Sequence, residues 1–218
     1  MKFKRLVTIL SVIVVLGISA AAYVPSAHAA PAPVLKPQSE SGDVWDLQYR
    51  LHALGYYNLP LDGKYGPATE AAVRKFQQNY GLAVDGVTGE ETWSALKKFS
   101  LNQEEMDILA KLIHAEARGE PFIGQVAVGA VVMNRLQSVT FPDTLRGVVF
   151  EPWAFTAVHD GQFWLTPNET AYQAAFEAVR GWDPTYESLY YFNPDVATNK
   201  WIWTRTQTVK IGKHIFAR

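Results

Sequence analysis

The stretch Leu61-Asp62-Gly63-Lys64-Tyr65-Gly66-Pro67-Ala68-Thr69 recurs in outline as Val84-Asp85-Gly86-Val87-Thr88-Gly89-Glu90-Glu91-Thr92. Both copies follow the pattern Asp-Gly-x-x-Gly-x-x-Thr, which marks them as an internal repeat. The Asp-Gly pair favours a tight turn with a positive φ, and the second Gly is a permissive helix N-cap. Pro67 and the acidic pair Glu90 and Glu91 then suit the first turn of a helix. Each copy therefore predicts a turn that starts a helix.

Apolar residues at helical spacing place three short helices around these turns. The pattern predicts helices over Asp43 to Leu54, Pro67 to Tyr80 and Glu90 to about Phe99. Gly55 and Gly81 follow the first two as stop signals. The sequence thus predicts a small three-helix bundle, and we set its boundaries at residues 42–99.

A second domain is predicted over residues 100–218. Its start, Asn102-Gln103-Glu104-Glu105, combines a helix N-cap with an acidic residue three positions later. Apolar residues recur at helical spacing from Met106 to Ala117, and the segment Phe122 to Leu136 is apolar nearly all round. Thr166-Pro167-Asn168-Glu169 marks a further helix start. We expect a mainly helical domain in which residues 122–136 form a central buried helix.

Glu116 lies on or beside the apolar face of the first helix of this domain. It follows Ile113 by three positions and Leu112 by four, so its carboxyl group is expected among apolar side chains. Such surroundings raise the pKa of a carboxyl group, and a protonated Glu can donate a proton to a glycosidic oxygen. A structural ion pair with Arg118 or Arg135 is the alternative that this pattern leaves open.

Aromatic residues are concentrated toward the C-terminal end of the chain. Their faces stack on sugar rings, and a groove of aromatic and polar side chains would suit a glycan strand. Most aromatic residues in so small a domain belong to its core, so only a few are expected to line such a groove. The substrate-binding residues that we predict are Phe155, Thr156, Tyr191, Phe192, Asn193 and Trp201.

The first residues of the chain have the pattern of a secretory signal peptide. Lys2, Lys4 and Arg5 precede an apolar run from Leu6 to about Val24, and Ala27-His28-Ala29 is a small-x-small cleavage site. We predict a signal peptide at residues 1–29; an uncleaved membrane anchor is the alternative. The Pro-rich residues 30–41 are expected to form an extended linker, with order beginning at about Gly42.

Charge and cysteine content exclude several classes of function. Without the leader, the chain would keep 17 Lys and Arg against 21 Asp and Glu, which offers no basic field for nucleic acid. The chain has no cysteine, so thiol nucleophiles are excluded. His114 and Glu116 are two positions apart on a helix and point to different faces, which disfavours a zinc site. We therefore predict no metal and no cofactor.

The N-terminal half resembles the common peptidoglycan-binding domain of wall hydrolases. Besides the two Asp-Gly turns, the resemblance rests on Gly42-Asp43-Val44, Leu47-Gln48, Leu54-Gly55-Tyr56 and Val73-x-x-Phe76-Gln77. It implies that this half binds peptidoglycan. A spacer whose helices merely pack together is the alternative.

The C-terminal half is similar to the SleB-type spore cortex-lytic enzymes. The motifs are Ile113-His114-Ala115-Glu116-Ala117-Arg118-Gly119-Glu120-Pro121, Val132-Met133-Asn134-Arg135, Tyr190-Tyr191-Phe192-Asn193-Pro194 and Ile211-Gly212-Lys213-His214. The resemblance implies an α+β domain like lysozymes and lytic transglycosylases, with a short β element. It also implies that Glu116 is the general acid/base of a lytic transglycosylase. Ala115 and Trp153 depart from the residues expected there, Gly and a basic residue, which leaves substrate detail open.

The same resemblance implies a biological setting. The substrate would be the bond between N-acetylmuramic acid and N-acetylglucosamine in cortex peptidoglycan that carries muramic δ-lactam, cleaved during spore germination. A monomeric enzyme is expected, exported across the membrane to the spore cortex and the inner-membrane or coat region, with a partner protein containing PepSY-type domains.

Several alternatives remain at this point. A hydrolase of the lysozyme type needs a second carboxylate, for which Glu151 and Asp160 are candidates, whereas Glu120 is separated from the helical register by Gly119. An amidase and a non-catalytic wall-binding protein are the rival classes of function.

Overall fold

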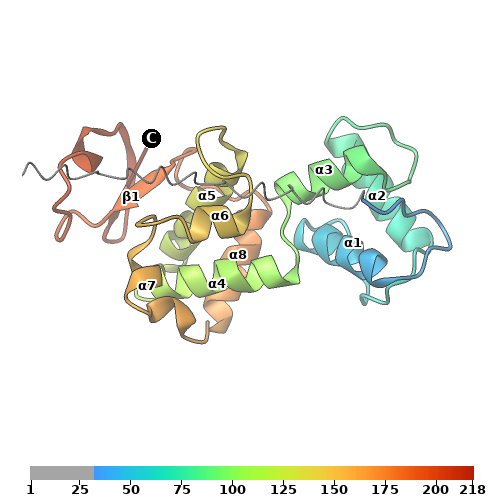
Figure 1. Cartoon of the computed structure of the whole chain (residues 1–218), viewed down its shortest axis with the longest axis horizontal. Coiled ribbons are helices and arrows are strands. Elements are labelled where there is room, and N and C mark those ends of the chain that lie inside the picture. The colour runs from blue at the N-terminus through green and yellow to red at the C-terminus, as the bar shows by residue number, and fades with distance from the viewer. Residues whose placement is uncertain (1–31) are drawn as a thin grey trace, which may run out of the picture. The chain divides into compact units, whose positions relative to one another are not determined.

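The computed structural model describes residues 32–218 (Figure 1). The predicted signal peptide lies outside the described residues. The described chain is mostly helical, with one small sheet near its C-terminal end, which confirms the predicted mainly helical fold class. Its elements are α1 (Gly42–Ala53), α2 (Pro67–Asn79), α3 (Glu90–Phe99), α4 (Gln103–Ala117), α5 (Phe122–Gln137), α6 (Leu145–Val149), α7 (Thr156–His159), η1 (Gln162–Trp164), α8 (Glu169–Val179), β1 (Tyr190–Phe192), η2 (Ile202–Thr204), β2 (Gln207–Ile211) and β3 (His214–Ala217). No helix within residues 32–218 has both the length and the apolar character needed to cross a membrane.

The helices α2 and α3 begin where the repeated turns predicted them. Gly66 is the N-cap of α2 with Pro67 directly after it, and Gly89 is the N-cap of α3. The Asp-Gly turns have φ values of +70° at Gly63 and +71° at Gly86, a conformation that favours glycine. The repeated sequence therefore fixes both helix starts through local backbone geometry.

Each turn is also held by a buried glutamine from the preceding helix. The side-chain amide of Gln48 donates to Asp62 Oδ1 (2.8 Å) and to Thr69 Oγ1 (3.1 Å). Gln77 repeats this arrangement with Asp85 Oδ1 (2.8 Å) and Thr92 Oγ1 (3.1 Å). Both glutamines are almost completely buried, so these bonds satisfy polar atoms that would otherwise be unpaired. The Asp and Thr positions of the repeat are thus parts of one hydrogen-bonded unit.

The structure corrects the expected linker at its described residues. Leu35 pairs with Thr88 in a β-bridge, and its side chain is 5% exposed. Trp93 donates from Nε1 to the carbonyl of Pro33 (2.7 Å), and Glu40 pairs with Lys64. Composition suggested a free tether, but a single buried Leu and a few backbone bonds are enough to fix this segment against the bundle.

Helices α4, α5 and α8 pack against one another and form the core of the C-terminal half (Figure 1). The capping box predicted at Asn102 is present, with Asn102 and Glu105 bonded reciprocally. A Cβ atom at Gly129 on α5 would lie 2.9 Å from Ala178 Cβ and 3.0 Å from Ile113 Cδ1. Only glycine therefore allows the observed approach of the three helices. As predicted, α5 is a central buried helix.

The antiparallel sheet has the strand order β1-β3-β2. Tyr191 in β1 is paired with Phe216 in β3, and Phe216 packs on Ala127 and Val131 of α5. This contact anchors the sheet to the central helix. It also places β1, and with it Tyr191, close to the end of α4 that carries Glu116.

Candidate active site

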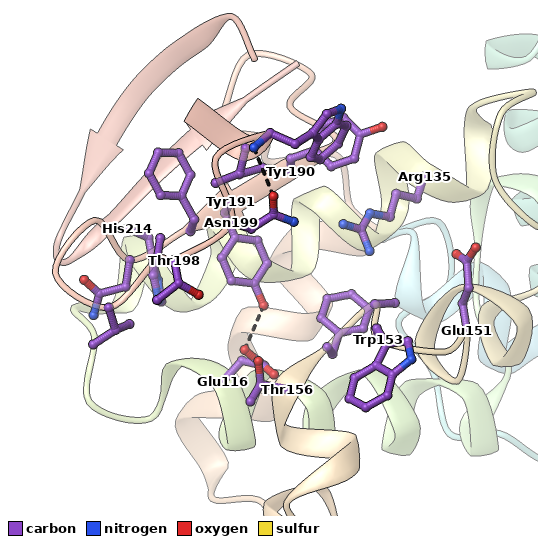
Figure 2. Close-up of a pocket in the computed structure, with 18 of the residues that line it drawn as sticks. Glu116, Arg135, Glu151, Trp153, Thr156, Tyr190, Tyr191, Thr198, Asn199 and His214 are labelled. Atoms are coloured by element: carbon purple, nitrogen blue, oxygen red, sulfur yellow. Dashed lines mark hydrogen bonds between the residues drawn. The ribbon is translucent and has the colours of Figure 1, made fainter. Parts of the chain in front are cut away.

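A pocket of about 890 Å³ lies between the end of α4, the segment before α7 and the C-terminal strands (Figure 2). Glu116 and Tyr191 meet inside it. The pocket contains every residue that we predicted for the site: Glu116, Phe155, Thr156, Tyr191, Phe192, Asn193 and Trp201. Other residues lining it include Arg135, Glu151, Trp153, Tyr190, Thr198, Asn199 and His214.

The carboxyl group of Glu116 is held by one hydrogen bond on each oxygen. The backbone N–H of Ala157 donates to Oε1 (2.9 Å), and the hydroxyl of Tyr191 donates to Oε2 (3.1 Å). Figure 2 shows the latter bond as a dashed line between the two side chains. Ala157 belongs to the short helix α7 and Tyr191 to β1, so two separate elements fix the orientation of this carboxyl group.

Burial raises the pKa of Glu116 above its ordinary value. The hydrogen bonds from Ala157 and Tyr191 stabilise the carboxylate and oppose that rise, while the negative charge of Asp160 adds to it. The result is a carboxylic acid that keeps its proton to higher pH than an exposed Glu. After the proton is donated, the hydrogen bonds from Ala157 and Tyr191 stabilise the anion that remains.

The structure does not support an ion pair for Glu116. Arg118 is exposed and donates to the side chain of Gln162 (2.6 Å), whereas Arg135 donates from Nε to the carbonyl of Leu189 (2.8 Å). Neither arginine forms a salt bridge with Glu116 in the part of the chain that the structure describes. Glu116 is therefore held by hydrogen bonds from Ala157 and Tyr191 and not by an ion pair with either arginine.

Tyr191 remains a phenol over the whole physiological pH range. Burial raises its pKa well above the ordinary value, and the negative charge of Glu116 acts in the same direction. Its ring packs against His214 (centroids 5.1 Å apart) and Phe216 (5.8 Å). Tyr191 is therefore a fixed hydrogen-bond donor to Glu116, not a base.

Exposed indole rings lie at the rim of the pocket. Trp153 is 83% exposed and stacks on His159, with centroids 4.4 Å apart and planes inclined by 21°. Its backbone has a φ of +67°, and its N–H donates to His159 Nε2 (3.0 Å). Trp201 is 46% exposed and contacts Tyr190 edge to face. These surfaces can stack on sugar rings.

The other acidic candidates occupy different environments. Glu151 lines the pocket but is exposed, and Figure 2 shows it beside Trp153, away from Glu116 in this view. Asp160 is exposed and accepts from the backbone of Gln162 (3.0 Å). Glu120 accepts from the backbone N–H of Lys213 (3.0 Å), which ties the β2–β3 turn to the connection between α4 and α5. Residues 32–218 contain no cluster of three or more His, Asp or Glu side chains arranged to hold a metal ion.

Sequence reasoning missed some parts of the site. The N–H of Ala157 carries no side-chain signal, and no pattern in the sequence points to it. The stack of Trp153 on His159 depends on the positive φ of Trp153, which no pattern in the sequence predicts. Arg135 was expected only as an ion-pair partner of Glu116, and its aromatic surroundings come from distant segments.

Comparisons with known proteins identify the family of this chain. Residues 119–217 match the Cell Wall Hydrolase family, and residues 40–96 match the Putative peptidoglycan binding domain family. The chain is 40% identical to a spore cortex-lytic enzyme of Bacillus cereus, over 85% of this chain and 86% of the relative. It is 39% identical to the spore cortex-lytic enzyme of Oceanobacillus iheyensis, over 85% of this chain and 87% of the relative.

Solved structures are similar to the C-terminal half. The catalytic domain of the Bacillus cereus SleB protein is 59% identical, with a TM-score of 0.53, over 55% of this chain and 93% of that domain. The catalytic domain of the germination-specific lytic transglycosylase SleB from Bacillus anthracis is also 59% identical, with a TM-score of 0.52, over 54% of this chain and 97% of that domain. The family matches, the identity over most of the chain and the shared catalytic-domain fold show that this protein belongs to the spore cortex-lytic enzyme family.

Proposed function

We propose that this protein is a lytic transglycosylase that cleaves the bond between N-acetylmuramic acid and N-acetylglucosamine in spore cortex peptidoglycan during germination. Glu116 is its general acid/base. The observation that carries this proposal is the partly buried carboxyl group of Glu116, which faces the pocket between two hydrogen-bond donors. A relative with 59% identity in this half is described as a germination-specific lytic transglycosylase, which supports the same reaction.

The reaction needs one carboxyl group. Glu116 donates its proton to the glycosidic oxygen, the bond from that oxygen to C1 of the muramic residue breaks, and positive charge develops at C1. The remaining carboxylate is stabilised by the N–H of Ala157 and the hydroxyl of Tyr191. It then takes the proton from the 6-hydroxyl of the same sugar as that oxygen attacks C1. The products are a 1,6-anhydro end and a free 4-hydroxyl, and Glu116 is again protonated.

A hydrolase with two carboxylates is supported less well. Such an enzyme needs its second carboxylate across the scissile bond, where it acts on water or on C1. Glu151 is the other carboxylate that lines the pocket, and its exposure gives it no comparable fixed position. Asp160 lies outside the residues lining the pocket and is bonded to Gln162.

The remaining assignments complete the proposal. Residues 42–99 act as the peptidoglycan-binding domain, which the family match over residues 40–96 supports, and residues 100–218 act as the catalytic domain. The cortex substrate carries muramic δ-lactam. The enzyme is exported by its leader to the cortex and the inner-membrane or coat region, acts as a monomer, and works with a partner containing PepSY-type domains.

The test uses purified cortex peptidoglycan and two matched substitutions. Glu116→Gln should lower the rate of solubilisation by at least about 100-fold, because general acid catalysis contributes on the order of 10² to 10⁴. Glu151→Gln should keep most of the wild-type rate. Loss of activity in both variants would indicate two catalytic carboxylates, and full activity of Glu116→Gln would refute the assignment of Glu116.

A further inference from the structure

Arg135 carries a buried charge that has no ion-pair partner within residues 32–218. The residue is 6% exposed, and its Nε donates to the carbonyl of Leu189 (2.8 Å). Within residues 32–218 its two terminal nitrogens have no hydrogen-bond partner, and it forms no salt bridge. Buried charges are normally paired, because desolvation of an unpaired ion is costly.

The guanidinium group is held rigidly. It lies 5.0 Å from the ring centroid of Phe141, 4.9 Å from that of Phe155 and 5.8 Å from that of Tyr190. These rings restrain the plane of the group, and the bond to Leu189 fixes its Nε edge. Figure 2 shows Arg135 projecting from α5 into the space that Glu116 and Tyr191 also face. The two terminal nitrogens of the guanidinium group can therefore donate hydrogen bonds to a ligand in the pocket.

The charges around Arg135 indicate the class of that ligand. The negative charges of Glu151 and Glu116 both act on Arg135 but lie beyond ion-pair distance. When Glu116 is protonated for catalysis, the negative charge of Glu151 still acts on the arginine, which reduces what the pocket gains from an additional anion. A neutral oxygen atom can accept hydrogen bonds from the terminal nitrogens of Arg135 without adding charge to the pocket.

We propose that Arg135 binds an amide carbonyl oxygen of the glycan next to the scissile bond. In peptidoglycan this group is either an N-acetyl carbonyl or the carbonyl of a muramic lactam. Arg135 would thus be a specificity-determining residue that recognises an acylated amino sugar. The inference rests on the proposed function, since it takes the pocket to be the glycan site.

The test compares three soluble glycans of equal length in the full chain: lactam-containing cortex fragments, lactam-free N-acetylated fragments, and the latter after chemical de-N-acetylation. Binding is measured by calorimetry in the Glu116→Gln background, so that no substrate is consumed. De-N-acetylation should weaken binding by about tenfold or more, as expected for loss of an acceptor to a charged donor. In the double variant with Arg135→Gln, this difference should disappear. The comparison of lactam-containing and lactam-free fragments identifies which carbonyl is bound.

Controls separate recognition from other roles. Arg118→Gln, an exposed arginine outside the pocket, should leave the preference intact. If Arg135→Gln does not fold, Arg135→Lys takes its place, because lysine keeps the charge but lacks the planar guanidinium group with its paired donors. This variant should retain the fold and lose most of the preference for the acetylated glycan. An unchanged preference in the Arg135 variants would overturn the inference. Because binding is measured without turnover, failure of the proposed reaction would be seen separately as an inactive wild type.

Discussion

Substitution of Tyr191 by Phe isolates the contribution of a single hydroxyl group to catalysis. The hydroxyl donates to Glu116 Oε2 over 3.1 Å, and the ring packs against His214 and Phe216. Phenylalanine keeps these ring contacts and removes only the donor. The carboxylate that forms when Glu116 gives up its proton would then keep only the bond from Ala157.

The size of the effect follows from the geometry. A hydrogen bond to a charged acceptor contributes about 1.5 to 3 kcal/mol. At 3.1 Å the bond is longer than typical O–H···O⁻ bonds, so the lower end of this range applies. A loss of about 1.4 kcal/mol in the transition state lowers the rate about tenfold. We therefore expect kcat on cortex fragments to fall by roughly tenfold with little change in KM.

The same variant should change the pH dependence of kcat. The Tyr191 hydrogen bond lowers the pKa of Glu116, so its removal should let the acid form persist to higher pH. The alkaline limb of the pH profile of kcat should therefore move to higher pH. Tyr172→Phe is the matched control, because Tyr172 donates to the carboxylate of Asp107 outside the pocket. An unchanged kcat and an unchanged alkaline limb for Tyr191→Phe would refute the role assigned to this hydroxyl.

Other substitutions test the remaining features of the account. Glu116→Gln should stabilise the fold by an amount that grows as pH rises from the ordinary pKa of a Glu to the raised pKa of Glu116, because over this window the unfolded wild type releases a proton that the folded state retains. Urea denaturation at several pH values measures this, and a difference that does not depend on pH would contradict it. Trp153→Ala should raise KM about three- to tenfold through lost sugar stacking, whereas Trp164→Ala, exposed outside the pocket, should not; equal effects would speak against a sugar platform. Gln77→Ala should lower the free energy of unfolding by about 2 to 4 kcal/mol, since it leaves the buried turn around Gly86 unpaired; a loss below about 1 kcal/mol in denaturation curves would show that water replaces the glutamine.

Features with a local chemical cause could be predicted from the sequence. The starts of α2, α3 and α4 follow from Gly66 with Pro67, from Gly89 and from Asn102, whose effects need only neighbouring residues. The partly buried position of Glu116 beside the apolar face of α4 also follows from spacing on a single helix. These predictions did not depend on how distant segments meet.

Features that depend on tertiary contact could not be derived in this way. The rings that surround Arg135 come from separate segments, two of them far along the chain at Phe155 and Tyr190. The N–H of Ala157 reaches Glu116 only because α7 folds back toward α4. Leu35 becomes buried because a β-bridge to Thr88 holds it, against the composition of its surroundings.

The central claim is that Glu116 alone serves as acid and then as base, with the 6-hydroxyl of the substrate as the nucleophile. Mass spectrometry of fragments released from cortex peptidoglycan in ¹⁸O-labelled water tests it most directly. We predict 1,6-anhydromuramic ends without label from the wild type, and no such ends from Glu116→Gln. Reducing muramic ends that carry ¹⁸O would show hydrolysis by water and contradict this account.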